Sequence, residues 1–166
     1  MAGELPTSAN AHRGCRLSPT ELLGLIPQQK PFRFVDEIVE VDESRILGHY
    51  TFRTDESFYS GHFPGHPVTP GVILLESMCQ IGVVALGIYL LGLEEDADEV
   101  RRWTTMFSDA QTEFLRPVLP GERVTIRGER IFWRRKKLQS RIEMLGEDGK
   151  PVAQATASGI GVRRKT

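Results

Sequence analysis

Two histidines, one glutamate and one glutamine stand close together in the sequence, and their types suit acid–base chemistry. His62 and His66 lie in a segment with proline at residues 64, 67 and 70. Glu76 and Gln80 follow in a long stretch that is otherwise apolar. A buried carboxylate is costly unless it is paired or used, and imidazole titrates near neutral pH. We therefore expect a general base and a general acid in this part of the chain.

The apolar stretch from Val72 to Leu91 predicts a helix that is buried on nearly all sides. Its uncharged run, Ser77 to Leu93, is shorter than the ~20 residues that a bilayer requires, and it contains three glycines. These features favour a core helix over a transmembrane span. Glu76 and Gln80 would lie one turn apart on the same face of this helix, where their side chains can form a hydrogen bond.

The three prolines before the helix predict a stiff, extended approach to it. His62 would then lie far from Glu76 of its own chain. Metal binding by His62 and His66 is a competing use of the histidines. Ligands spaced four residues apart align only on a helix, which Pro64 and Pro67 argue against. We therefore expect no metal, and we give His66 a structural role.

The rest of the chain alternates between polar and apolar residues as β-strands do. The predicted strands are Phe32–Val41, Arg45–Arg53, Trp103–Glu113, Glu122–Trp133, Leu138–Leu145 and Pro151–Val162. Before them, Ser18 and Pro19 mark a helix start, with Glu21 completing a capping box. One long buried helix and about six mostly antiparallel strands predict an α+β fold in which the sheet wraps around the helix.

Composition bounds the class of protein. The chain has 166 residues, 40% of them hydrophobic, and a formal net charge of −1. We expect a single domain over residues 17–166, preceded by a polar tail, residues 1–16, that is disordered. The charge balance does not favour nucleic acid or a membrane surface as partner. Two cysteines and a polar N-terminus without a signal sequence favour a soluble, cytoplasmic protein.

The motif around the histidines points to one family. The string His62-Phe63-Pro64-Gly65-His66-Pro67-x-x-Pro70-Gly71, with Glu76 and Gln80 after it, closely resembles the signature of FabZ-type 3-hydroxyacyl-[acyl-carrier-protein] dehydratases. Residues 31–36 are similar to the first strand of that family, and residues 114–122 to its later F-x-R-P-V-x-P-G-D/E turn. The resemblance covers roughly residues 17–162. It implies the hot-dog fold and the dehydration of (3R)-3-hydroxyacyl-acyl carrier protein to the trans-2-enoyl thioester, without a cofactor.

Each of the four site residues fits one need of that reaction. His62 is the natural base for the C2 proton, and Glu76, desolvated in an apolar helix, can protonate the departing hydroxyl or hold a water that does. The Gly71 N–H, at the start of the helix, can donate to the thioester oxygen, and Gln80 can orient Glu76. The resemblance implies these same roles. It also implies a homodimer in which His62 of one subunit meets Glu76 of the other, and such dimers can stack into a trimer of dimers.

Two further groups of residues are candidates for substrate contacts. An acyl chain needs an apolar tunnel, for which the candidates are Tyr59, Phe63, Ile73, Met78, Val84, Phe107 and Phe114. The basic run Arg134, Arg135, Lys136 and Lys137 could receive the acidic surface of acyl carrier protein. A solvated basic turn is the alternative reading of that run.

Two other functions stay open on sequence grounds. A hot-dog thioesterase would use its carboxylate to activate water, and a non-catalytic acyl-carrier or lipid-binding module would use the same fold without chemistry. Thr69 and the run Gln28-Gln29-Lys30 depart from the common pattern of the family. These departures leave the pathway open between fatty-acid and polyketide or polyene biosynthesis.

Overall fold

A computed structural model describes residues 14–165, which form one six-stranded sheet and one long helix with short helices around them. The elements in chain order are α1 (Pro19–Leu25), β1 (Glu37–Val41), β2 (Arg45–Thr51), η1 (Ser57–Ser60), α2 (Gly71–Cys79), η2 (Gln80–Ala85), α3 (Leu86–Glu94), α4 (Ala97–Val100), β3 (Trp103–Phe114), β4 (Arg123–Arg134), β5 (Lys137–Leu145) and β6 (Pro151–Arg163). The predicted disordered tail falls almost wholly outside the described residues and stays a prediction.

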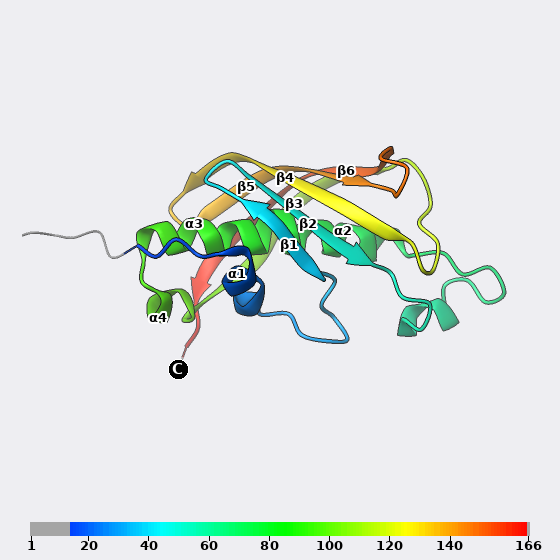
Figure 1. The fold of residues 1–166 in the computed structure, drawn as a ribbon, viewed down its shortest axis with the longest axis horizontal. Helices are drawn as coiled ribbons and strands as arrows, with labels where there is room; N and C mark the ends of the chain where they lie inside the picture. The colour runs from blue at the N-terminus through cyan, green and yellow to red at the C-terminus, as the bar shows by residue number, and fades with distance from the viewer. Residues whose placement is uncertain (1–13, 166) are drawn as a thin grey trace, which may run out of the picture.

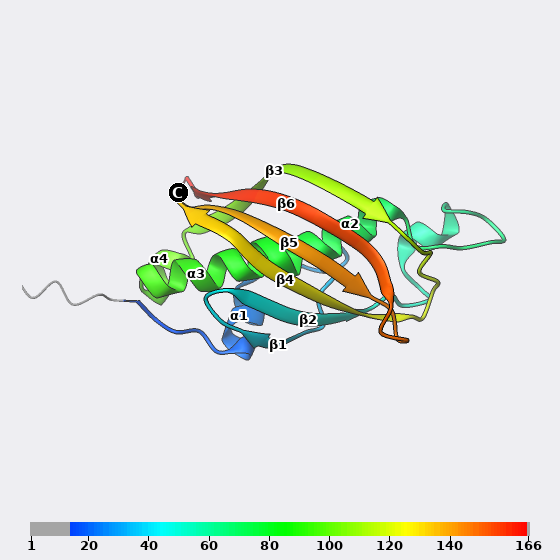
Figure 2. The same cartoon turned by 90° about the horizontal axis from the view of Figure 1, so that it is seen from above.

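The sheet is antiparallel throughout, with the strand order β1-β2-β4-β5-β6-β3. It curves over one side of the long helix, while α1 lies on the other side of the helix, near β1 (Figure 1). Seen from above, β3 forms one edge of the sheet and β1 the other (Figure 2). The predicted α+β arrangement of six strands around one buried helix is confirmed.

The segments α2, η2 and α3 form one continuous helix, Gly71–Glu94. By length and composition it could cross a membrane, yet 67% of its most apolar window is buried inside the protein. Met78, Ile81 and Leu86 on this helix have no exposed surface. It is therefore the core helix that the sequence predicts. Its middle segment, Gln80–Ala85, is wound as a π-helix, a form that often occurs near functional residues.

Two glycines let the helix and the sheet touch backbone to backbone. A Cβ atom on Gly128 of β4 would lie 2.8 Å from the Cα of Gly82 in the π-helical segment. A Cβ atom on Gly82 would lie 2.7 Å from the side chain of Ile142 on β5. Neither position has room for a side chain, so the closest approach of helix and sheet is fixed here.

The segment before β1 differs from the prediction. The predicted strand begins at Phe32, but the observed strand begins at Glu37. The reason is that the backbone of Phe34 bonds to helix side chains: its N–H donates to Gln80 and its carbonyl accepts from Ser77. Residues 32–34 are thereby held against the central helix rather than in the sheet.

Strand β3 is a long edge strand. It has twelve residues and pairs with β6, and within residues 14–165 it has no other partner. Met106, Phe107 and Phe114 on this strand are 55%, 57% and 46% exposed. An unpaired edge with exposed apolar side chains is a surface on which another strand can add.

Candidate active site

Glu76 and Gln80 lie one turn apart on the central helix and are hydrogen-bonded to each other. Nε2 of Gln80 donates to Oε1 of Glu76 at 2.8 Å and to the carbonyl of Phe32 at 2.8 Å. Oε1 of Gln80 accepts from the N–H of Phe34 at 2.8 Å. The side chain of Gln80 is completely buried. Because the Phe34 N–H needs an acceptor, the amide nitrogen of Gln80 is the end that faces Glu76.

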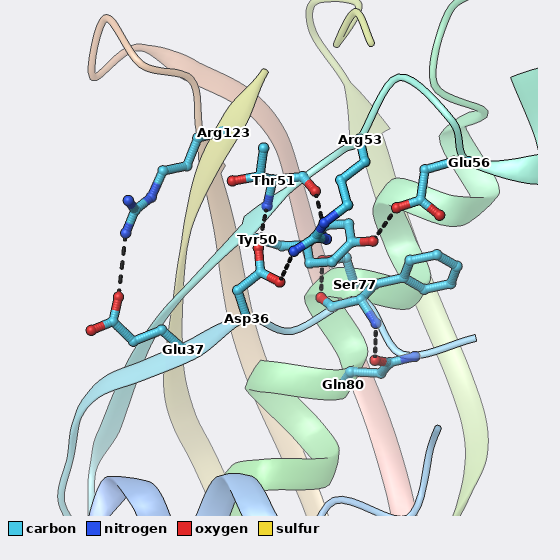
Figure 3. A network of polar contacts seen from close by, with 10 residues as sticks. Asp36, Glu37, Tyr50, Thr51, Arg53, Glu56, Ser77, Gln80 and Arg123 are labelled. Carbon is cyan, nitrogen blue, oxygen red and sulfur yellow. Dashed lines mark hydrogen bonds and ion pairs between the residues drawn. The ribbon is translucent and has the colours of Figure 1, made fainter. Parts of the chain in front are cut away.

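Ser77 is a positioning residue that the sequence reasoning missed. Its hydroxyl donates to the carbonyl of Phe34 at 2.8 Å, and it lies beside Gln80 in Figure 3. Together, Ser77 and Gln80 anchor residues 32–34 to the helix. The available signal was the one serine of an apolar helix, which directly follows Glu76 and precedes Gln80 by three residues.

Cys79 also lies on this helix but cannot act as a nucleophile. It is buried, and this burial, followed by the nearby charge of Glu76, raises its pKa to about 12. A thiol with such a pKa carries almost no thiolate at neutral pH. The chemistry of this region therefore belongs to oxygen and nitrogen groups.

A polar network anchors the segment that leads to His62 (Figure 3). The hydroxyl of Tyr50 on β2 donates to Glu56, the residue that precedes η1. Asp36 accepts from Arg53 and from the Thr51 N–H, each at 2.8 Å. Burial, then the hydrogen bond to Glu56, raises the pKa of Tyr50 above its usual value. The start of η1 is thus fixed to β2.

His62 follows η1, in a loop that folds back on itself. Its Nδ1 lies 3.0 Å from the carbonyl of Val68. Because a carbonyl can only accept, Nδ1 carries the proton in the neutral ring and Nε2 has the free lone pair. The Val68 N–H in turn donates to the carbonyl of His62 at 3.3 Å. The ring is therefore held in the form that can accept a proton.

The predicted extended approach to the helix is wrong. Residues 61–66 form turns, with a bond of 2.9 Å from the His66 N–H to the carbonyl of Phe63 and a φ of 83° at Gly65. A positive φ is easily adopted by glycine, so Gly65 allows the chain to reverse. Prolines at 64, 67 and 70 set the local backbone but do not keep the segment straight.

His62 and Glu76 are not joined within one chain. The ring of His62 bonds to Val68, the carboxylate of Glu76 bonds to Gln80, and no hydrogen bond links the two residues within residues 14–165. The loop that carries His62 projects beyond the start of α2 in both views (Figures 1 and 2). One subunit therefore presents the two groups separately.

Gly71 begins the helix, with Pro70 as its N-cap. The first N–H groups of a helix have no partner within it. A Cβ atom at Gly71 would lie 3.0 Å from the ring of Phe114, at the end of β3. The glycine thus allows Phe114 to pack closely on the helix start, in addition to any role of its N–H.

The predicted tunnel residues divide between core and surface. Met78, Val84 and Tyr59 are buried, and the Tyr59 hydroxyl lies 2.6 Å from the hydroxyl of Thr69. Ile73 is half-buried, whereas Phe63, Phe107 and Phe114 are exposed. A cavity of about 20 Å³, the size of one water, lies between α3 and the sheet and contains none of these residues. The tunnel stays a prediction.

The basic run at the β4–β5 turn is partly neutralised by acids of the same chain. Lys136 forms ion pairs with Glu94 and Glu95, and Lys137 lies 3.7 Å from Asp109. Arg134 and Arg135 are exposed. Half of the predicted carrier contact is therefore engaged in holding the turn to α3 and β3.

Comparison with known proteins agrees with this geometry. Residues 26–156 match the family model of the FabA-like domain. The chain belongs to this family. A 3-hydroxyacyl-[acyl-carrier-protein] dehydratase FabZ of Acidiphilium cryptum is 35% identical over 162 residues, 96% of this chain and 93% of the relative. The FabZ of Geobacter metallireducens is 39% identical over 108 residues, 64% of this chain and 68% of the relative. The resemblance to FabZ-type dehydratases is confirmed.

Solved structures of lower sequence identity share the fold. A thioesterase of Haemophilus influenzae, HI1161, superposes with a TM-score of 0.65 at 19% identity, covering 92% of this chain and 95% of that one. The PaaI protein of E. coli superposes with a TM-score of 0.55 at 19% identity, covering 74% and 80%. At such identities the likeness shows the fold alone, and the predicted hot-dog fold is confirmed.

Proposed function

We propose that the protein is a soluble, cytoplasmic, cofactor-free enzyme that dehydrates (3R)-3-hydroxyacyl thioesters of acyl carrier protein to trans-2-enoyl thioesters. The observation that carries this proposal is the carboxylate of Glu76, oriented by the buried and fully bonded Gln80. The FabZ relatives are named for this reaction. The pathway is fatty-acid synthesis or a related polyketide-type synthesis.

His62 acts as the base. Its Nε2 takes the C2 proton, and the electron pair of that C–H bond moves toward the thioester carbonyl. The bond from Nδ1 to the Val68 carbonyl fixes the orientation of the ring and stabilises the imidazolium that forms. The oxygen of the developing enolate is the next group that needs a donor.

The start of the central helix supplies that donor. The N–H of Gly71 points away from the helix body, with the dipole of the 24-residue helix behind it. Phe114 packs on Gly71 and shields one side of the site from water. The negative charge that develops on the thioester oxygen is thereby stabilised.

Glu76 acts as the acid. Gln80 donates to Oε1, which leaves Oε2 as the oxygen from which a proton would be given. This proton passes to the C3 hydroxyl as the C3–O bond breaks and the C2–C3 double bond forms, and water leaves. Transfer of the proton from His62 to Glu76, directly or through water, then restores the starting protonation states of both residues.

A homodimer completes the site. The edge of β3 can pair with the same strand of a second subunit across a two-fold axis, which would extend the sheet and cover the exposed apolar residues. As the resemblance to FabZ-type dehydratases implies, His62 of one subunit and Glu76 of the other would form one site in such a dimer. Stacking of such dimers into a trimer of dimers stays a prediction.

Mass spectrometry of the protein with 3-hydroxyacyl-acyl carrier protein tests the proposal. We expect the carrier-bound acyl group to lose one molecule of water. Release of the free hydroxy acid would make the protein a thioesterase instead, and binding without any mass change would make it an acyl-binding module.

A further inference from the structure

Two buried hydroxyl groups meet at the base of the loop, residues 60–68, that carries His62. The hydroxyl of Tyr59, in η1, lies 2.6 Å from the hydroxyl of Thr69, two residues before the helix start at Gly71. Tyr59 is 7% exposed and Thr69 is 4% exposed. Thr69 is also a position at which the chain departs from the common pattern of the family. The candidate mechanism assigns no task to this pair.

Each of the two hydroxyls depends on the other. Neither has another hydrogen-bond partner within residues 14–165. Burial raises the pKa of Tyr59, so the phenol is uncharged at neutral pH and the contact joins two neutral groups. Loss of one partner would leave the other hydroxyl buried and unpaired, which is unfavourable.

The backbone at Thr69 connects His62 to the core of the protein. The peptide unit between Val68 and Thr69 is planar. Its carbonyl accepts from Nδ1 of His62 at 3.0 Å, and its N–H donates to the carbonyl of Val118 at 2.9 Å. Val118 belongs to the buried core. A rotation of this peptide unit would therefore break both bonds at once.

The other side of His62 is attached to η1. Its N–H donates to the carbonyl of Phe58 at 3.0 Å. The ring of Phe58 packs edge-on against the rings of Tyr59 and Phe34, with centroids 4.7 Å and 6.2 Å apart. The bond between Tyr59 and Thr69 thus joins the two segments that hold His62, one before it in the chain and one after it.

We propose that Tyr59 and Thr69 are positioning residues for His62. Their hydrogen bond keeps the Val68–Thr69 peptide unit in the orientation in which its carbonyl accepts from Nδ1, so that the lone pair of Nε2 stays free to take a proton. Because both hydroxyls are buried and bonded to each other, they act through His62 and not on the substrate. The proposal rests on the proposed function, in which His62 is the base.

NMR of isotope-labelled histidine rings tests this arrangement without a substrate. At about pH 8, where a free imidazole is neutral, the unchanged protein should show the proton of His62 on Nδ1. In Tyr59→Phe and in Thr69→Val we expect a mixture of the two neutral forms, with the proton shared between Nδ1 and Nε2. Thr69→Ser keeps a hydroxyl and should retain the original signal. Comparison with His62→Gln assigns that signal to its residue.

Steady-state kinetics with 3-hydroxybutyryl-acyl carrier protein tests the consequence for catalysis. A misplaced base lowers kcat without weakening the binding of the substrate. We expect kcat to fall at least about ten-fold in Tyr59→Phe and in Thr69→Val, with KM changed by less than about two-fold. Both substitutions break the same bond, so the double variant Tyr59→Phe/Thr69→Val should be no slower than the slower single variant.

Thermal unfolding separates positioning from a purely structural role. Each single variant leaves one buried hydroxyl unpaired and should unfold at a lower temperature. The double variant removes both hydroxyls and should regain part of that loss. We expect its kcat to stay low although its stability recovers. Recovery of kcat together with stability would show that the pair only stabilises the fold, and would overturn the proposal.

Two controls remove the same chemical groups elsewhere. Tyr89→Phe on α3 and Thr156→Val on β6 lie outside the loop and its contacts and should leave kcat and the ring signal unchanged. An unaltered ring signal in both single variants overturns the positioning proposal, as does an unaltered kcat. An unchanged protein that leaves the substrate intact overturns the proposed function instead, and the ring signal then still decides whether the pair holds His62.

Discussion

At the residue scale, the candidate site depends on the side-chain amide of Gln80, whose oxygen and nitrogen both form hydrogen bonds within the protein. Gln80 uses its oxygen on Phe34 and its nitrogen on Phe32 and Glu76. A residue bonded in this way cannot rotate without leaving a buried backbone group unpaired, which costs roughly 1–3 kcal/mol. The orientation of Glu76 is therefore determined by the fold rather than by the substrate.

Glu76→Gln should abolish turnover while the protein stays folded. The amide keeps the size of the side chain and can still accept from Gln80, but it cannot give up a proton to the C3 hydroxyl. We expect kcat to fall by at least about a hundred-fold, with a thermal unfolding midpoint close to that of the unchanged protein. Glu129→Gln, on the exposed face of β4, is the matched control. A Glu76→Gln enzyme that keeps most of its activity would remove Glu76 from the mechanism.

At the element scale, η1 and its loop depend on the contact between Tyr50 and Glu56. The folded protein holds the phenol proton more tightly than the unfolded chain does, because burial and the bond to Glu56 raise the pKa of Tyr50. This contribution to stability is complete below the usual tyrosine pKa of about 10. It is lost progressively as the pH rises above that value.

Urea unfolding at about pH 8 and about pH 10.5 should reveal this dependence. The free energy of unfolding of the unchanged protein should fall between the two pH values, and the fall should be smaller in Tyr50→Phe. Tyr59, whose pKa is also raised by burial, accounts for part of the remaining loss, so Tyr50→Phe/Tyr59→Phe should flatten the profile further. An equally steep loss in Tyr50→Phe would assign the alkaline instability to other groups.

The elements differ in how far the sequence determines them. The central helix was predictable because its apolar residues leave no polar face, and the contact of Gln80 with Glu76 follows from helical spacing. The departure of residues 32–36 from the predicted strand could not be predicted, because the hydrogen-bond partners of Phe34 lie more than forty residues away. The turns of the His62 loop and the ion pairs of Lys136 likewise depend on contacts that no local pattern encodes.

At the scale of the whole molecule, no hydrogen bond joins His62 to Glu76 within the described residues of one subunit, and the proposed dimer would bring the two groups together. If His62 and Glu76 of a site come from different subunits, His62→Ala and Glu76→Ala homodimers should each be nearly inactive. A dimer of one His62→Ala subunit and one Glu76→Ala subunit then has one site with both substitutions and one site with neither.

Co-expression of the two variants with different tags should therefore restore activity, up to about half per mixed dimer if the sites act independently. Purification through both tags isolates the mixed species and verifies subunit exchange. The absence of any rescue in that species would place both residues of a site in the same chain.

The contact of Gly82 with Gly128 also has a mechanical consequence. Because no side chain separates the two backbones and Ile142 packs beside them, we expect this contact to resist sliding of the helix along the sheet more than a small rocking about this point. Glu76 precedes this pivot by six residues, a lever arm of about 9 Å, so a rocking of about 5° would move its backbone by less than about 1 Å. The end of α3 at Glu94 lies about twice as far from the pivot as Glu76 does, so the same rocking would move it about twice as far.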